Sequence, residues 1–175
     1  ARDRWGVSGN PADAVKLALR ELLPVRPDIV VSGLNNGFNT GSNIIYSGTV
    51  AAALEGVQNG ITSFAVSREF SEDDDYRAQA RLAAGLVARL AAMQPRAANV
   101  FNINIPAGRP RGVVATVAEP VPFPDRYDRR RDPRGLDYYW LRGVPLRRLR
   151  HDGRITDDGA VSRGYVSVTP LRRDL

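Results

Sequence analysis

The sequence has no cysteine and only one histidine, His151, among its 175 residues. The lack of cysteine excludes disulfide scaffolds, thiolate-bound zinc and thiol nucleophiles, and it suits a reducing compartment, so we expect a cytoplasmic protein. A single histidine excludes a metal held by several imidazoles. Any bound metal therefore needs oxygen ligands, which suit hard ions such as magnesium, manganese or calcium.

The sequence also lacks the roughly 20 consecutive apolar residues that would span a bilayer, and it opens without a basic and apolar leader, so we expect no membrane partner. Its length and its composition of 43% hydrophobic and 25% charged residues predict one folded domain over residues 1–175. The net charge of +6 permits attraction to phosphate groups without selecting nucleotide, nucleic acid or anionic lipid as the ligand.

Strands and helices alternate in the first part of the chain. A capped, proline-initiated segment at 10–23 predicts a helix that ends before Pro24, and further helices are expected from about 48 to 56 and from 76 to 93. Apolar runs at 28–33, 61–67 and 99–106 predict buried strands between them. This alternation is typical of a parallel α/β sheet, whose ligands lie beyond the carboxyl ends of the strands.

The regular alternation of strands and helices stops near residue 108. We therefore divide the domain into an α/β core at 1–108 and a β-arm with a C-terminal strand at 109–175. Strands are expected at 113–117 and 164–170, and no helix is evident in the charge-dense stretch at 125–142 between them. Nine arginines between Arg126 and Arg150 are mixed with aspartates and aromatic residues. That mixture suits a contact between subunits at least as well as it suits RNA, so nucleic acid is not the expected partner.

The most informative segment is Ser32–Asn43, which follows a predicted strand and contains four asparagines and three glycines. Small polar residues at a strand's carboxyl end let backbone amides and carboxamides approach a ligand. The alternative is an ordinary loop in which Asn and Gly adopt left-handed turn conformations. Asn102 and Asn104 share one side of a strand, where one of them either faces the ligand or fixes a neighbouring loop.

Two predicted helix starts carry further polar residues. Ser47, Gly48 and Thr49 open one helix, where free amides, hydroxyls and the positive end of the helix dipole are able to bind phosphate, although a serine N-cap is a sufficient explanation. Asn10, Pro11 and Asp13 open the first helix, and a cap followed by proline and an acid explains them structurally. No Walker A loop or Gly-x-Gly-x-x-Gly fingerprint is present.

In order along the chain, these motifs resemble the SurE survival-protein family. The resemblance rests on Gly9–Ala18, Asp28–Asn39, Tyr46–Gly56, Asn102–Pro106 and Gly164–Leu171. It implies a Rossmann-like three-layer α/β sandwich with a mostly parallel sheet and an extended C-terminal β-arm. It also implies a homodimer or tetramer joined through that arm.

The resemblance further implies a divalent-metal-dependent phosphatase, a 5′-nucleotidase that acts on nucleoside 5′- and 3′-monophosphates and on short polyphosphate. Asn35 would be a ligand of one magnesium or manganese ion, and Ser47, Gly48 and Thr49 would bind phosphate. The substrate pocket would be formed by five further residues: Asn10, Pro11, Asp13, Asn39 and Asn104. The alternative function is a basic nucleotide- or RNA-binding module, or an oligomerisation module, without chemistry.

One family motif has no match. The family's Asn-Asp-Asp-Gly motif, which supplies two aspartate ligands, does not occur in this sequence, and Asn10 replaces the family's threonine. We therefore expect those carboxylates to lie upstream, the catalytic residues to be outside this chain, and the chain to be inactive by itself. We also expect an uncovered apolar sheet edge beside Ile29, Val30 and Val31.

Overall fold

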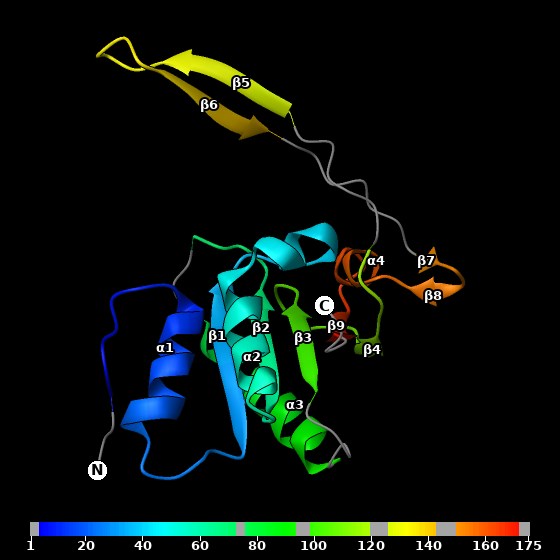
Figure 1. Cartoon of the computed structure of the whole chain (residues 1–175). Helices are drawn as coiled ribbons and strands as arrows, with labels where there is room; N and C mark the ends of the chain where they lie inside the picture. The colour runs from blue at the N-terminus through cyan, green and yellow to red at the C-terminus, as the bar shows by residue number, and fades with distance from the viewer. Residues whose placement is uncertain (1–3, 73–75, 94–98, 120–125, 143–149, 172–175) are drawn as a thin grey trace.

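A computed structural model of the chain describes residues 4–72, 76–93, 99–119, 126–142 and 150–171 (Figure 1). Its main sheet has five strands in the order β1-β2-β3-β9-β4. These strands are β1 (Ile29–Asn36), β2 (Thr62–Arg68), β3 (Val100–Ile105), β4 (Val113–Ala115) and β9 (Val166–Leu171). Strands β1, β2 and β3 are parallel, β9 is antiparallel to β3, and β4 is parallel to β9. The predicted, mostly parallel sheet is thus confirmed.

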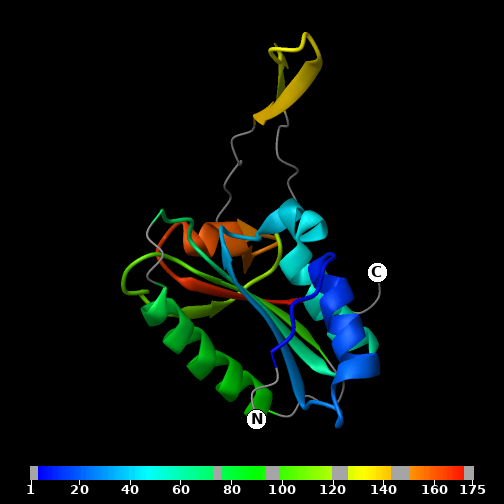
Figure 2. The same ribbon diagram turned by 90° about the vertical axis from the view of Figure 1, so that its left-hand side faces the viewer.

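Helices cover both faces of this sheet. Helices α1 (Pro11–Leu17) and α2 (Gly48–Gln58) lie on one side, and α3 (Arg77–Ala92) lies on the other (Figure 2). A π-helical turn over Ala18–Leu22 continues α1, so the helix ends before Pro24 as its sequence predicts. The three-layer α/β/α arrangement follows from sheet strands that are apolar on both faces.

The alternation of side chains along β2 gives the protein two apolar clusters. Phe64 and Val66 point toward α3, where they pack with Ala83, Val87 and residues of β3 and β9. Ala65, between them in the sequence, belongs to the second cluster with residues of α2. Phe64 and Ala65 are both fully buried, so this central strand is covered on each side and gives the sheet a rigid middle.

Strand β1 runs further than its sequence suggests. We expected a strand at 28–33 followed by a loop, but the strand continues to Asn36, and Asn35 pairs with Ser67 of β2. The register shifts between Ser32 and Asn35, around Gly33. Gly33 has a φ of 131°, and a Cβ atom there would lie 2.3 Å from the Val66 carbonyl oxygen. A glycine is needed at this close approach. Because the end of β1 has the residue composition of a loop, the sequence does not indicate that it belongs to the strand.

The C-terminal part contains a helix that we did not expect. Helix α4 (Asp157–Val161) follows Thr156, whose hydroxyl accepts a hydrogen bond from the Gly159 amide at 3.1 Å. Five residues are too few for apolar periodicity to reveal a helix, so only the Thr-Asp-Asp start gives a signal. The sequence analysis did not find this helix.

Two hairpins also form in this part of the chain. Strands β7 (Arg150–His151) and β8 (Arg154–Ile155) make a short one, and the side chain of His151 lies outside the described residues. Strands β5 (Arg126–Arg131) and β6 (Asp137–Arg142) make a longer antiparallel pair that stands apart from the five-stranded sheet in Figures 1 and 2. Its exposed aromatic residues lie among charged pairs: Asp137 with Arg129 and Arg131, and Asp128 with Arg142.

Candidate functional site

Several predicted site residues lie at one edge of the sheet. The parallel pairing of β1, β2 and β3 puts their carboxyl ends together, and helices α1 and α2 begin at the same edge (Figure 1). Asn35 is the second-last residue of β1, Asn104 lies near the end of β3, and Ser47 precedes α2. The edge at which parallel α/β sheets bind ligands therefore carries most of the polar residues that the sequence singled out.

Asn35 is half-buried, and its carboxamide is oriented by its own loop. The side-chain Nδ2 donates a hydrogen bond to the Gly37 carbonyl at 2.8 Å. Because the nitrogen is used in this way, the carboxamide oxygen is the atom that Asn35 can offer to a ligand. Its neighbour Asn36 is exposed and instead makes two hydrogen bonds with the backbone of Ser71, in the loop that follows β2.

Asn39 fixes the loop that follows β1 to strands β2 and β3. Its backbone amide donates to the Asn104 side chain at 2.8 Å, and its Nδ2 donates to the Ser67 hydroxyl at 2.7 Å. The carboxamides of Asn102 and Asn104 both donate to the Asn39 carbonyl. Asn102 and Asn104 are fully buried, so asparagines do fix a neighbouring loop here. Contact of Asn39 or Asn104 with a substrate stays a prediction.

The starts of α1 and α2 touch each other. A Cβ atom at Gly48 would lie 3.2 Å from Cγ of Pro11, so the two helix ends approach closely at this glycine. The Ser47 hydroxyl accepts a hydrogen bond from the Val50 amide at 3.2 Å, which makes it the N-cap of α2. Asn10 and Asp13 form a reciprocal capping box at α1. The structure therefore brings together the two polar helix starts that the sequence presented separately.

Asp157 is a buried residue of this region that our sequence analysis missed. Its carboxylate accepts hydrogen bonds from three backbone amides: Gly41 at 2.9 Å, Glu119 at 2.9 Å and Asp158 at 2.8 Å. Burial raises the pKa of Asp157 above its ordinary value of 3.8, against the lowering effect of these hydrogen bonds. Only the Thr-Asp-Asp sequence could have indicated it, as the start of a helix.

This raised pKa predicts a pH dependence of stability. Because the folded chain binds the Asp157 proton more tightly than the unfolded chain does, the stabilising contribution of this group is full below pH 3.8 and is lost as pH rises through the folded-state pKa. We expect the Tm of the wild type, relative to that of Asp157→Asn, to fall as pH rises from about 4 to about 7. Thermal denaturation followed by circular dichroism measures this, and a difference that rises with pH would contradict it.

The described residues do not hold a divalent metal ion by themselves. No group of three or more His, Cys, Asp or Glu side chains suited to a metal occurs within the ranges that the structure describes. Asn35 fits as one neutral oxygen ligand, but a lone carboxamide does not compensate the dehydration of a hard dication. The donor set therefore fits one position of a metal site and lacks the anionic ligands.

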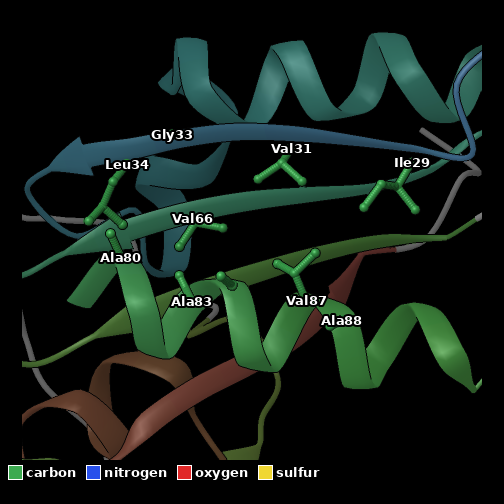
Figure 3. A pocket seen from close by; sticks show the side chains of 10 residues that line it. Ile29, Val31, Gly33, Leu34, Val66, Ala80, Ala83, Val87 and Ala88 are labelled. Atoms are coloured by element: carbon green, nitrogen blue, oxygen red, sulfur yellow. The ribbon is translucent and has the colours of Figure 1, made fainter. Parts of the chain in front are cut away.

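An apolar groove lies on the α3 side of the edge strand β1. Its volume is about 390 Å³, and it lies between β1 and α3 (Figure 3). Val31 is 50% exposed here, and β1 is the first strand of the sheet. The lining residues are Ile29, Val31, Gly33, Leu34, Val66, Ala80, Ala83, Ala84, Val87 and Ala88. Of the three residues expected beside an uncovered apolar edge, Ile29 and Val31 line this groove, whereas Val30 lies against Gly56 of α2.

The chain is similar to proteins of one family. The sequence model of the family "Survival protein SurE" matches residues 1–121. The 5′-nucleotidase SurE of Pelotomaculum thermopropionicum is 44% identical over 171 residues, covering 98% of this chain and 65% of the relative. The 5′-nucleotidase SurE of Symbiobacterium thermophilum is 45% identical, covering 97% of this chain and 66% of the relative. The chain thus spans just under two thirds of the length of these relatives.

A solved structure agrees with the sequence relatives. The crystal structure of the SurE protein from Aquifex aeolicus superposes with a TM-score of 0.79 at 36% sequence identity, over 96% of this chain and 68% of that chain. The family match extends over more than half of the chain, and the same fold recurs in the crystal structure. On these grounds the chain belongs to the SurE family.

Proposed function

We propose that the protein containing this chain is a nucleotidase that hydrolyses phosphate monoesters of nucleosides. The observation that carries the proposal is that β1, which contains Asn35, ends at the edge of the sheet where α2, which Ser47 caps, begins. Relatives named 5′-nucleotidase SurE support the reaction class. We extend the proposal to 3′-monophosphates and short polyphosphate, because the helix start would bind the phosphoryl group common to all three.

In this proposal Ser47, Gly48 and Thr49 bind the phosphate through backbone amides and hydroxyls at the positive end of α2. Asn10, Pro11 and Asp13 would border the substrate pocket, because α1 begins against Gly48. Asn39 and Asn104 would act on the same pocket, because their hydrogen bond fixes the loop that follows β1. The backbone amides at the start of α2 would stabilise negative charge on the phosphoryl oxygens during transfer.

We further propose that Asn35 contributes one oxygen ligand to a magnesium or manganese ion. When bound, such an ion polarises a phosphoryl oxygen and lowers the pKa of a bound water. The described residues bring a single neutral ligand to it, so no catalytic carboxylate of this chain is assigned. We propose a cytosolic location as well, which suits a chain without cysteine.

The test of this function measures phosphate release from nucleoside 5′-monophosphates. We expect the gene product that contains this chain to release phosphate, and a chelator to abolish the activity until magnesium or manganese is restored. The 175-residue chain alone should show negligible turnover, because it offers the ion one neutral ligand. Activity that survives chelation, or full turnover by the 175-residue chain, would contradict the proposal.

A second candidate function is binding of nucleotide or RNA without chemistry. The exposed β5–β6 hairpin favours it, since Arg130 lies over the Trp140 ring at 5.9 Å and further arginines lie beside tyrosines. Binding of this kind would weaken steeply with salt and would survive chelation. The chelation experiment therefore separates the two functions.

We propose that the same hairpin joins copies of the chain into a homodimer or tetramer. Its strands expose Tyr127, Tyr139, Trp140 and Leu141, and aromatic residues with arginine are enriched in interfaces. Deletion of residues 125–150 is expected to reduce the oligomer to monomers. Light scattering after size-exclusion chromatography measures this, and an unchanged mass would contradict it.

As for a membrane partner, the described helices include none with the length and apolar character of a span.

A further inference from the structure

The loop that leads into α2 is held from a distant part of the sequence. Oδ2 of Asp157 accepts a hydrogen bond from the Gly41 amide at 2.9 Å, across 116 positions of the chain. Oδ1 accepts from the amides of Glu119 and Asp158 at 2.9 and 2.8 Å. Asp157 is fully buried, so water does not compete for these hydrogen bonds. One carboxylate thus joins the loop, the segment after β4 and α4.

Asp157 itself is firmly anchored. Its backbone amide donates to the Val117 carbonyl at 2.9 Å, and the Val117 amide donates to the Ile155 carbonyl at 2.9 Å. Thr156, which is also fully buried, caps α4 in front of it. A second contact runs beside the first, from the Thr40 hydroxyl to the Asp158 carboxylate at 3.3 Å. The anchor is therefore part of the folded core, and the loop is the part that it holds.

The loop is built to accept this anchor at Gly41. Gly41 has a φ of 55°, and a Cβ atom there would lie 2.9 Å from the Glu119 carbonyl oxygen. Gly41 is also the first residue of the 3-10 helix Gly41–Tyr46, which ends directly at Ser47, the N-cap of α2. Because the 3-10 helix leads directly into α2 without an intervening loop, the position of the Gly41 amide determines where Ser47 and Gly48 lie.

We propose that Asp157 is a positioning residue, which fixes the Gly41–Ser47 turn and thereby the start of α2 that would bind phosphate. The phosphate role rests on the proposed function, but the anchoring of the turn does not. The carboxylate offers two oxygens to three N–H donors, whereas the amide of asparagine would turn an N–H group toward one of them. Asp157→Asn therefore changes the hydrogen bonding with almost no change in shape.

The test compares Asp157→Asn with Thr116→Val in the gene product that contains this chain. Thr116 is a matched control, because its substitution also removes one buried hydrogen bond, to the Thr169 hydroxyl, without touching the loop. We expect amide hydrogen exchange over Gly41–Ser47 to become about tenfold faster or more in Asp157→Asn. The amide resonances of Gly48 and Thr49 should also move, and both readouts should stay unchanged in Thr116→Val at a comparable loss of Tm.

Titration with inorganic phosphate adds the functional readout. We expect a dissociation constant about tenfold higher or more in Asp157→Asn than in Thr116→Val. Unchanged exchange and unchanged Gly48 and Thr49 resonances in Asp157→Asn would overturn the inference. No phosphate binding by the wild type would instead contradict the proposed function, because exchange decides the anchoring without any ligand.

Two measurements cover the case in which Asp157→Asn does not fold. The Gly41 amide of the wild-type chain should be strongly protected from exchange, and an unprotected Gly41 amide would overturn the inference without any substitution. Gly41→Ala disrupts the contact between the Gly41 amide and Asp157 from the loop side, since the added Cβ would collide with the Glu119 carbonyl. It should reproduce the shifts of the Gly48 and Thr49 resonances, and their absence in a folded Gly41→Ala chain would count against the anchor.

Discussion

Asn35→Ala in the gene product that contains this chain is expected to lower phosphate release from nucleoside 5′-monophosphates by about a hundredfold or more. The substitution removes the oxygen that Asn35 offers at the end of β1, together with the hydrogen bond from its Nδ2 to the Gly37 carbonyl. Steady-state assays at saturating magnesium or manganese give kcat and KM for the two proteins. An unchanged kcat/KM would contradict the role assigned to Asn35.

Asn36→Ala is the matched control for this prediction. Asn36 is the adjacent residue of β1. Its side chain also makes hydrogen bonds with the backbone, but its partner is Ser71 in the loop that follows β2. Because successive residues of a strand point to opposite faces, its side chain points away from that of Asn35. We expect Asn36→Ala to keep the activity within about threefold of the wild type, since a typical exposed hydrogen bond contributes only about 0.5–1.5 kcal/mol.

Ser47→Asp separates the structural role of Ser47 from its proposed phosphate role. Aspartate caps a helix about as well as serine does, and its charge suits the helix N-terminus, so we expect the Tm to stay level or rise. The same negative charge would repel a phosphoryl group at this position. At a separation of about 4 Å, repulsion between unit charges is about 1–4 kcal/mol near a protein surface, which weakens phosphate binding by about tenfold or more.

The comparison needs two further variants. Ser47→Ala removes the cap, whose hydroxyl accepts from the Val50 amide, and should cost about 1 kcal/mol of stability. Tyr76→Asp puts the same charge at the N-cap of α3 and should leave phosphate affinity unchanged. Calorimetric titration with phosphate and thermal denaturation provide the data. If Ser47→Asp binds phosphate as tightly as the wild type does, Ser47 is only a cap.

The sequence predicted the layers of the fold well, because its strands and helices differ strongly in local pattern. β2 and β3 are short, apolar and bounded by loops, and α3 matches the predicted helix to within one residue at each end. β1 was predicted too short because its last residues, such as Asn35 and Asn36, have the composition of a loop. Their pairing with β2 depends on the close approach at Gly33, a tertiary contact that local sequence does not show.

The candidate site was predicted in its parts, but not in its connections. The sequence presented Ser47 and Pro11 as starts of separate helices, and only the fold shows that the two helices meet at Gly48. Asp157 escaped prediction because its partners, Gly41 and Glu119, are distant in the sequence. A buried carboxylate that binds backbone amides has no local pattern beyond a helix cap, so its role emerges only from three-dimensional contacts.

Phosphate binding at the start of α2 is tested most directly by titrating the isotope-labelled gene product that contains this chain with inorganic phosphate and following its backbone amides by NMR. We expect saturable shifts of the Gly48 and Thr49 amides, because the start of α2 offers free N–H groups to the anion. In Ser47→Asp we expect the same shifts to need about tenfold more phosphate or more. Shifts confined to the arginines of the β5–β6 hairpin, with Gly48 and Thr49 unaffected, would contradict phosphate binding at the start of α2 and favour a basic binding module.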